Sequence, residues 1–156
     1  MNAAEHVLRG GLAAAGPDGL AIVGAQESLT YAALIQRVGQ FAAGLRAAGL
    51  RPGDRVALLM LDTPDLAALH LAVMAAGGIA VALSGRSALH DLRRSLALVR
   101  PAAIAVDREF APVAELCLAA ESRAPLILRE DDLARWKATE AEFAPMRSTP
   151  NMVPSA

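Results

Sequence analysis

The sequence predicts an α/β fold of three layers, in which a mostly parallel sheet is covered by helices on both faces. Short apolar stretches rich in β-branched residues alternate along the chain with longer segments in which apolar residues recur at helical spacing. Gly and Pro residues separate the two kinds of segment. This alternation is typical of βαβ units, whose right-handed crossovers place helices on both faces of a sheet.

The first long helix is predicted to follow a hairpin over about residues 20–30, formed by "LAIVG" and "ESLT". Thr30 is the candidate N-cap of this helix. The apolar stripe expected to face the core is Leu34, Val38, Phe41 and Leu45. Gly49 follows the last turn, and "RPGD" predicts a turn with Pro52 and Gly53 at its centre. The apolar run "RVALLML" is then typical of a strand covered on both faces.

The segment 61–86, "LDTPDLAALHLAVMAAGGIAVALSGR", is apolar enough to compare with a membrane span. A spanning helix needs about 20 apolar residues without strong breakers, and Gly77 with Gly78 interrupts this one. Thr63 as N-cap and Pro64 as first helical residue predict a helix start. We therefore predict a helix, a tight turn at Gly77 and a buried strand "IAVAL", with a membrane span as the alternative.

Two further units follow. Ser87 is a candidate cap for a helix whose stripe is Leu89, Leu92, Leu96 and Val99, and "AAIAVD" is the next strand. Another helix is expected to bury Val113, Leu116, Cys117 and Ala120, followed by the strand "PLIL" and a short helix that starts at "EDD". We predict one α/β domain over residues 1–136 and an extended or disordered tail over 137–156.

Composition narrows the function classes. The net charge is −1, the basic residues are spread along the chain, and only 3% of residues are aromatic, which argues against nucleic-acid binding. Cys117 is the single cysteine, so no intrachain disulfide forms and a cytoplasmic location is expected. Its apolar setting favours a core residue over a nucleophile. The first 19 residues lack the pattern of a signal peptide.

Motifs for chemistry are sparse. The sequence has neither G-x-G-x-x-G nor G-x-x-x-x-G-K-[ST], and its histidines lack metal-site spacing, so we predict no metal site and identify no catalytic residue. The candidates for an anion site are Ser84, Arg86 and Ser87, at a predicted strand-to-helix edge whose backbone N–H groups could bind an anion. The alternative is a turn with a cap and no ligand. The residues alone thus predict an α/β domain and do not indicate which reaction, if any, it performs.

Three segments, taken in their order along the chain, resemble a known protein family. "SLTYAAL", then "LRAAGLRPGDRVALLMLDTPDLAALHLAVMAAGGIAVALSGR", then "LVRPAAIAVD" resembles the N-terminal part of AMP-forming acyl-CoA synthetases and ligases, the adenylate-forming superfamily. The resemblance covers about residues 20–128, and "LDTPDL" is similar to the benzoate and aryl-acid branch. It implies the fold of that family's N-terminal subdomain. The sequence departs at Ala33, where the family has a capping-box glutamate, and at Ala82, Ser84 and Gly85, where it has Pro, Asn and Pro.

The resemblance implies a ligase reaction, but the sequence has no counterpart of two motifs that this reaction requires. The family enzymes use ATP, Mg²⁺ and CoA, and they need a phosphate loop and a C-terminal lysine to stabilise charge on the phosphates. Neither has a counterpart here, since Lys137 does not match that lysine's context. We therefore expect a truncated N-terminal domain of an ATP-dependent acyl- or aryl-acid:CoA ligase that is inactive alone and binds no cofactor by itself.

Two alternatives remain open at this point. One is a stand-alone scaffold or regulatory protein derived from such a ligase, and the other is a small α/β enzyme or ligand-binding domain with a site of its own. The chain has a high apolar content (54%). We therefore expect its apolar faces to be covered by self-association, such as a dimer, or by another protein.

Overall fold

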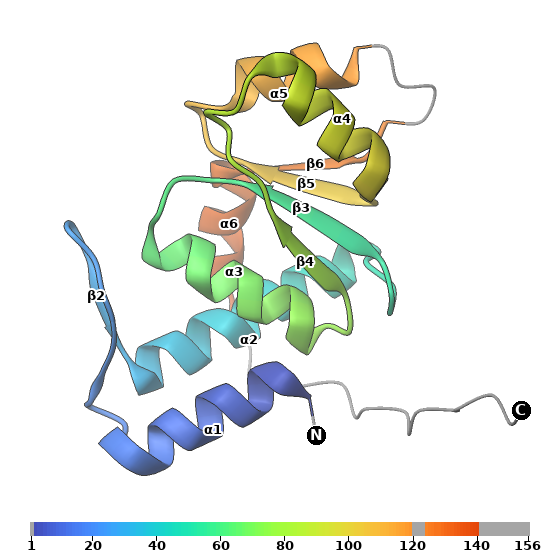
Figure 1. Cartoon of the computed structure of the whole chain (residues 1–156). Coiled ribbons are helices and arrows are strands. Elements are labelled where there is room, and N and C mark those ends of the chain that lie inside the picture. The colour runs from blue at the N-terminus through green and yellow to red at the C-terminus, as the bar shows by residue number, and fades with distance from the viewer. Residues whose placement is uncertain (1, 120–123, 141–156) are drawn as a thin grey trace, which may run out of the picture.

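The computed structural model describes residues 2–119 and 124–140 (Figure 1). The elements follow in the order α1 (Ala3–Ala15), β1 (Leu20–Val23), β2 (Ser28–Thr30), α2 (Tyr31–Ala47), β3 (Arg55–Leu59), α3 (Pro64–Ala75), β4 (Ile79–Ala82), α4 (Leu89–Val99), β5 (Ala103–Val106), α5 (Ala111–Leu118), β6 (Leu126–Arg129) and α6 (Glu130–Lys137). Lys137, the first residue of the predicted tail, ends α6. The tail beyond residue 140 and Ala120 lie outside the described residues.

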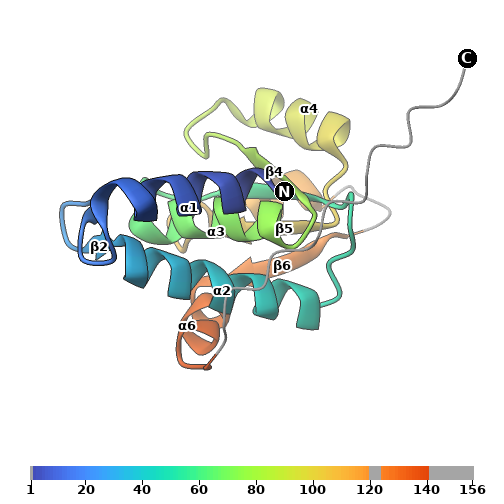
Figure 2. The same cartoon turned by 90° about the horizontal axis from the view of Figure 1, so that it is seen from below.

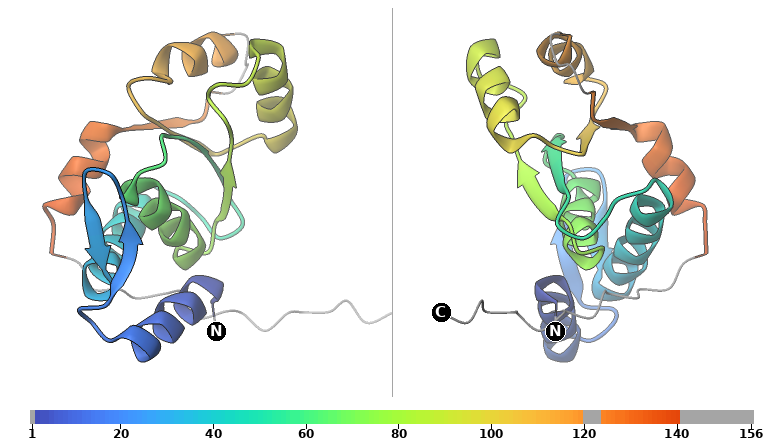
Figure 3. Two further views of the ribbon diagram at one scale, coloured as in Figure 1. Left: turned by 60° about the vertical axis from the view of Figure 1, so that its left-hand side comes forward. Right: turned by 90° about the vertical axis from the view of Figure 1, so that its right-hand side faces the viewer.

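The centre of the fold is a four-stranded sheet with the order β4-β3-β5-β6, in which every neighbouring pair is parallel. Helices α2 and α3 pack on one face, and α4 and α5 pack on the other (Figures 1 and 3). The predicted fold class, a mostly parallel sheet between two helical layers, is therefore confirmed.

Strand β3 shows why its sequence is apolar without alternation. Val56 and Leu58 belong to the core beneath α2 and α3, while Ala57 and Leu59 belong to the core beneath α4 and α5. All four side chains are buried. A central strand with helices on both faces has no solvent side, and so every position favours an apolar residue.

The helix ends follow the local signals in the sequence. Thr30 accepts a hydrogen bond from Ala33 N (3.2 Å), and Thr63 accepts one from Leu66 N (3.3 Å). Gly77 has φ +86°, the left-handed conformation that ends α3. The predicted helix, turn and strand of residues 61–86 are thus confirmed. No helix in the described part of the chain is long and apolar enough to cross a membrane.

Three local expectations are wrong. The strand "IAVAL" was expected to be buried, but β4 lies at an edge of the sheet and Ile79 is 50% exposed, because β3 is its only strand neighbour among the described residues. Ser87 does not cap a helix, since Ala88 is the N-cap of α4 and makes no side-chain cap bond. Leu116 was placed on the buried face of α5, but the helix buries Ala114 and Cys117 instead.

Helix α1 has no counterpart among the elements predicted from the sequence. It lies along α3 and α2 on the side of the molecule away from the sheet (Figure 2). Asn2 caps it by accepting a hydrogen bond from Ala4 N (2.9 Å), and its side-chain amide donates to Met74 O at the end of α3 (2.6 Å). Gly11 lets the Tyr31 ring lie against α1, because a Cβ at this position would overlap that ring. The hairpin of β1 and β2 is antiparallel and joins α1 to α2.

Candidate functional site

The carboxyl ends of the parallel strands meet at one edge of the sheet. The β3–α3–β4 connection leaves β3 over one face, and the β5–α5–β6 connection leaves β5 in the opposite direction over the other face, so the connections diverge between β3 and β5. Open α/β sheets bind ligands in the crevice outside such a switch point. A groove of about 1090 Å³ lies here, lined by residues that follow the strands, such as Leu61, Ser84 and Asp107, and by residues of α6. We call it the switch-point groove.

Asp107 is the buried polar residue of this groove. It follows β5, and its Oδ2 accepts a hydrogen bond from Leu61 N after β3, at 2.5 Å. Burial raises the pKa of the Asp107 carboxyl above its usual value, the hydrogen bond from Leu61 opposes this, and the nearby charges of Glu130, Asp65 and Glu109 raise the pKa further. The carboxylate ties together the two strand ends that flank the switch point.

The three anion-site candidates occupy the turn after β4. Ser84 and Arg86 line the switch-point groove, whereas Ser87 is exposed and does not. Ser84 Oγ accepts a hydrogen bond from Arg86 N at 3.3 Å. The Arg86 guanidinium pairs with Glu109 at 3.0 Å, and its centre lies 6.0 Å from the Phe110 ring centroid. A carboxylate therefore already compensates the one cation of this turn, and the anion site stays a prediction.

The charge of the groove is unfavourable for a polyphosphate. Six lining residues are acidic (Glu27, Asp62, Asp65, Asp107, Glu130, Asp131) and two are basic (Arg86, Lys137). Like charge at close range disfavours anion binding. Within the described residues, no three His, Cys, Asp or Glu side chains are grouped so that they could hold a metal ion.

An ion-pair network at the end of the groove connects four elements. Arg37 on α2 makes two hydrogen bonds to Glu27 beside the hairpin, both 2.7 Å, and one to Asp65 on α3 at 2.9 Å. Lys137 on α6 also pairs with Asp65, at 2.8 Å. The hydrogen bonds from Arg37 lower the pKa of Glu27, and the same contact raises the pKa of Arg37.

Helix α6 is fixed across α2 by a second set of contacts. The buried side chain of Gln40 donates to Lys137 O (2.9 Å) and Thr139 O (2.8 Å). Trp136 packs against Gly44, where a Cβ would overlap the indole ring, and meets Phe41 edge-on with ring centroids 6.4 Å apart. These contacts set the position at which the chain leaves the described fold near residue 140.

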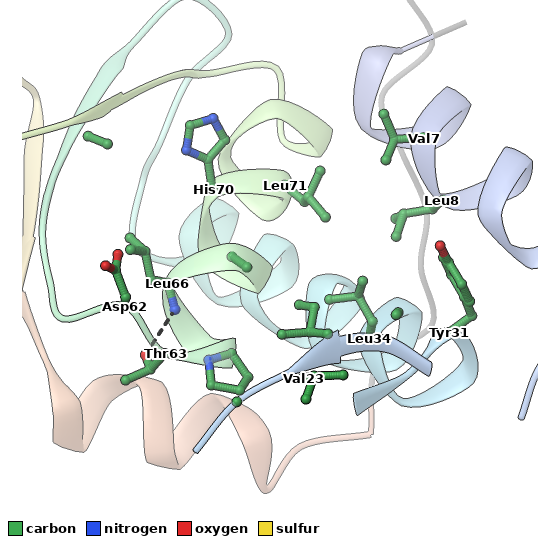
Figure 4. A pocket seen from close by; sticks show the side chains of 16 residues that line it. Val7, Leu8, Val23, Tyr31, Leu34, Asp62, Thr63, Leu66, His70 and Leu71 are labelled. Carbon is green, nitrogen blue, oxygen red and sulfur yellow. Dashed lines mark hydrogen bonds between the residues drawn. The ribbon is translucent and has the colours of Figure 1, made fainter. Parts of the chain in front are cut away.

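A second cavity, of about 600 Å³, lies between α1, the hairpin and α3 (Figure 4). Its walls are mainly apolar, with Val7 and Leu8 from α1, Val23 from β1, and Leu66 and Leu71 from α3 among the lining residues. We call it the apolar hollow. The volume lies within the range of small-molecule sites, but the hollow is open on the side of α1 and β1, where Val7 (56%) and Val23 (75%) are exposed.

The remaining sequence candidates lie apart from one another. His70 is half-buried on α3 and lines the apolar hollow. Cys117 is buried in the core beneath α5, and burial raises the pKa of its thiol, which disfavours a nucleophile. Asp107 was missed as a site residue, although its place at the end of the strand "AAIAVD" is a signal for the carboxyl edge of a parallel sheet.

Known proteins share both the sequence and the fold of this chain. Residues 12–155 match the AMP-binding enzyme family. The chain is 38% identical over 111 residues to the 3-hydroxybenzoate–CoA ligase of Aromatoleum sp. strain CIB, which covers 71% of this chain and 21% of the relative. It is 42% identical over 81 residues to a feruloyl-CoA synthase of Amycolatopsis sp., covering 52% of this chain and 16% of the relative.

Solved structures show the same arrangement of elements. A benzoate CoA ligase from Burkholderia xenovorans LB400 matches 96% of this chain with a TM-score of 0.82 at 24% identity, over 31% of the ligase chain. ATP-bound MatB from Rhodopseudomonas palustris matches 96% of this chain with a TM-score of 0.77 at 28% identity, over 30% of MatB. The chain thus spans about a fifth of the length of the first curated relatives (21% and 18%) and about a third of these solved chains.

The match begins at residue 12, so it includes every lining residue of the switch-point groove, whereas Val7 and Leu8 of the apolar hollow precede it. It confirms the resemblance that the sequence motifs indicated, including the similarity to ligases of aryl acids. The family match covers most of the chain, and the relatives align over their N-terminal portion. On this evidence the chain belongs to the AMP-binding enzyme family.

Proposed function

We propose that this chain forms the N-terminal α/β part of an AMP-forming aryl-acid:CoA ligase, and that it does not activate an acid by itself. The observation that carries the proposal is the family match over residues 12–155, combined with a chain that spans only about a fifth of its curated relatives. The chain supplies a scaffold on which the rest of a ligase assembles.

The charge of the switch-point groove supports inactivity of the isolated chain. Adenylation develops negative charge on phosphate oxygens, and positioned cations and N–H donors must stabilise that charge. The groove has a net excess of carboxylates, Arg86 is paired with Glu109, and Lys137 is paired with Asp65. ATP, Mg²⁺ and CoA would therefore be held by parts of a ligase outside the described residues.

Aryl acids are the proposed substrate class of the whole ligase. The relatives named above are a 3-hydroxybenzoate–CoA ligase and a feruloyl-CoA synthase, and a solved neighbour is a benzoate CoA ligase. All three names describe aromatic carboxylic acids. We also propose a cytoplasmic location, which the single cysteine supports.

The test is ATP–pyrophosphate exchange with benzoate, 3-hydroxybenzoate and ferulate. It is run on the chain alone and on a chimera in which the chain replaces the matching N-terminal region of the Aromatoleum ligase. We expect no exchange from the chain alone and exchange from the chimera. Exchange by the chain alone would refute the proposed inactivity. A folded chimera without exchange, beside an active parent ligase, would refute the ligase assignment.

A second candidate is a stand-alone scaffold or regulatory protein that acts through protein contacts. The exposed apolar side chains around the apolar hollow favour it, as does the place of β4 at the edge of the sheet that the described residues form. An inactive chimera together with a stable, monodisperse isolated chain would support this candidate over the first.

A further inference from the structure

Strand β4 has a free edge in the sheet that the described residues form. The N–H groups of Ile79 and Leu83 donate to carbonyls of the segment 54–58, at 2.8 and 3.0 Å, so these residues direct their backbone groups toward β3. Backbone groups alternate in direction along a strand, and those of Ala80 and Ala82 therefore point away from the sheet. Among the described residues, β3 is the only strand beside β4 (Figure 1). A free edge of this kind is a template for pairing with a further strand.

The sequence of β4 does not block such pairing. Natural edge strands use charged side chains, proline or a bulge for this purpose, whereas β4 reads IAVA and pairs with β3 in an unbroken register. The family that the sequence resembles has a proline at the position of Ala82. A proline there has no N–H to donate to a further strand. Ala82 is exposed and supplies this donor, so the edge of this chain can pair where the family pattern cannot.

The sequence of β4 is also complementary to itself around Val81. If two copies pair antiparallel about a twofold axis at Val81, Ala80 lies opposite Ala82 of the other copy, and the two residues exchange both hydrogen bonds. Val81 then lies opposite itself, and Ile79 lies opposite Leu83, in non-hydrogen-bonded pairs whose side chains are close. These three apolar side chains share one face of the sheet, where Leu83 packs on the core beneath α4 and α5. One register thus satisfies the free backbone groups and matches the apolar side chains.

The surface beside β4 extends the contact beyond the strand. Specific interfaces bury about 1,200–2,000 Å² in total, so the flanking elements must contribute area besides the two strands. Ile79 is 50% exposed on one face of the sheet. On the other face Ala82 lines the apolar hollow together with Leu66 and His70 of α3, which are half-buried. A strand that pairs at Ala82 therefore lies next to α3 and covers apolar groups on both faces.

We propose that the free edge of β4 is a pairing surface for a second copy of this chain, with Val81 on the twofold axis. The two four-stranded sheets then join into one continuous sheet. Because the same edge is used by both copies, the contact closes on itself and the assembly stops at a dimer. The inference goes beyond the proposed function and does not depend on it.

Two substitutions at the edge test the surface. Ala82→Pro removes an N–H that points away from β3 and so costs no hydrogen bond of the sheet, and Ile79→Lys adds a charge of the kind that natural edges carry. Leu126→Lys is the matched control, since Leu126 is 44% exposed on β6, the strand at the opposite end of the strand order. Sedimentation velocity over a range of micromolar concentrations gives the dimer dissociation constant of each chain, and circular dichroism shows that each is folded.

The unmodified chain and the control should sediment as dimers, and each edge variant should raise the dissociation constant by about tenfold or more. A cross-link tests the register. A non-hydrogen-bonded pair brings its Cα atoms to about 4.5 Å, which is within the range of a disulfide. Val81→Cys should therefore link two copies under mild oxidation, whereas Leu126→Cys should not. The native Cys117 is buried and should not contribute.

An unmodified chain that stays monomeric at every concentration would overturn the proposal. A dimer whose dissociation constant is unchanged in the folded edge variants would also overturn it, because the copies would then meet at another surface. The same holds if Val81→Cys cross-links no faster than Leu126→Cys. These outcomes are independent of pyrophosphate exchange. A chimera without exchange, beside a dimer that both edge variants dissociate, would contradict the proposed function and leave the pairing surface intact.

Discussion

The contact between Gly44 and Trp136 makes a direct prediction about the attachment of α6. A Cβ at residue 44 would overlap the indole ring, so Gly44→Ala must displace Trp136. Displacing Trp136 breaks its edge-on contact to Phe41. It also breaks the two hydrogen bonds that Gln40 donates to Lys137 O and Thr139 O at the end of α6. The variant therefore separates α6 from α2 while it leaves the core of α2 and α3 in place.

The expected magnitude follows from opposing contributions. An interior Gly→Ala change gains about 1 kcal/mol of helix propensity, whereas the lost aromatic contact costs about 0.5–1.5 kcal/mol and each lost hydrogen bond about 0.5–1.5 kcal/mol. The net expectation is a free energy of unfolding lower by about 0.5–3.5 kcal/mol in the Gly44→Ala variant.

Trp136 is the only tryptophan in the chain, so its fluorescence reports on α6 alone. Urea unfolding gives the stability, and the native emission maximum should shift to longer wavelength as the ring becomes solvated. Gly10→Ala in α1 is the matched control, since a Cβ there meets nothing within 4 Å and should only stabilise. A Gly44→Ala protein as stable as the control, with unchanged emission, would refute the packing described for α6.

Three further predictions concern titratable groups. Because its pKa is raised in the fold, Asp107 contributes stability at acid pH that is lost as pH rises through the folded value. The Asp107→Asn variant keeps an acceptor for Leu61 N but does not titrate. The urea midpoint of this variant, relative to that of the wild type, should therefore increase as pH rises from 3 to 7. The lowered pKa of Glu27 gives the opposite sign: Glu27→Gln, which weakens the pair with Arg37, should cost under about 1 kcal/mol at neutral pH and nothing at pH well below 4.5. Cys117, buried and with a raised thiol pKa, should react with a disulfide reagent slowly in the native protein and rapidly in urea, and a fast native reaction would contradict its core position.

The parts of the fold that the sequence predicts well depend on local chemistry. Thr30 and Thr63 cap helices because a hydroxyl at the N-cap accepts from a backbone N–H three residues on, and this needs no knowledge of the rest of the fold. Gly77 ends α3 because its positive φ is accessible to glycine at little cost. The burial of β3 is also predictable from its sequence, because an apolar run without alternation is typical of a strand covered on both faces.

The parts that could not be predicted depend on the order of the strands. Asp107 is buried because β5 lies next to β3, which places its carboxylate beside Leu61 N from a distant loop. The network around Arg37 joins Glu27, Asp65 and Lys137 across the chain. No spacing in the sequence reveals such contacts, since each depends on long-range packing.

Strand β4 has an apolar sequence that does not match its exposed position in the sheet. Its sequence, IAVA, is typical of a strand covered on both faces, yet it lies at the edge of the sheet with Ile79 half exposed. A strand that evolved at a solvent edge usually carries charges or a proline that block pairing, and β4 has neither. Its composition therefore fits an environment with more polypeptide around it than the described residues supply, which is the setting that the proposed second copy would provide.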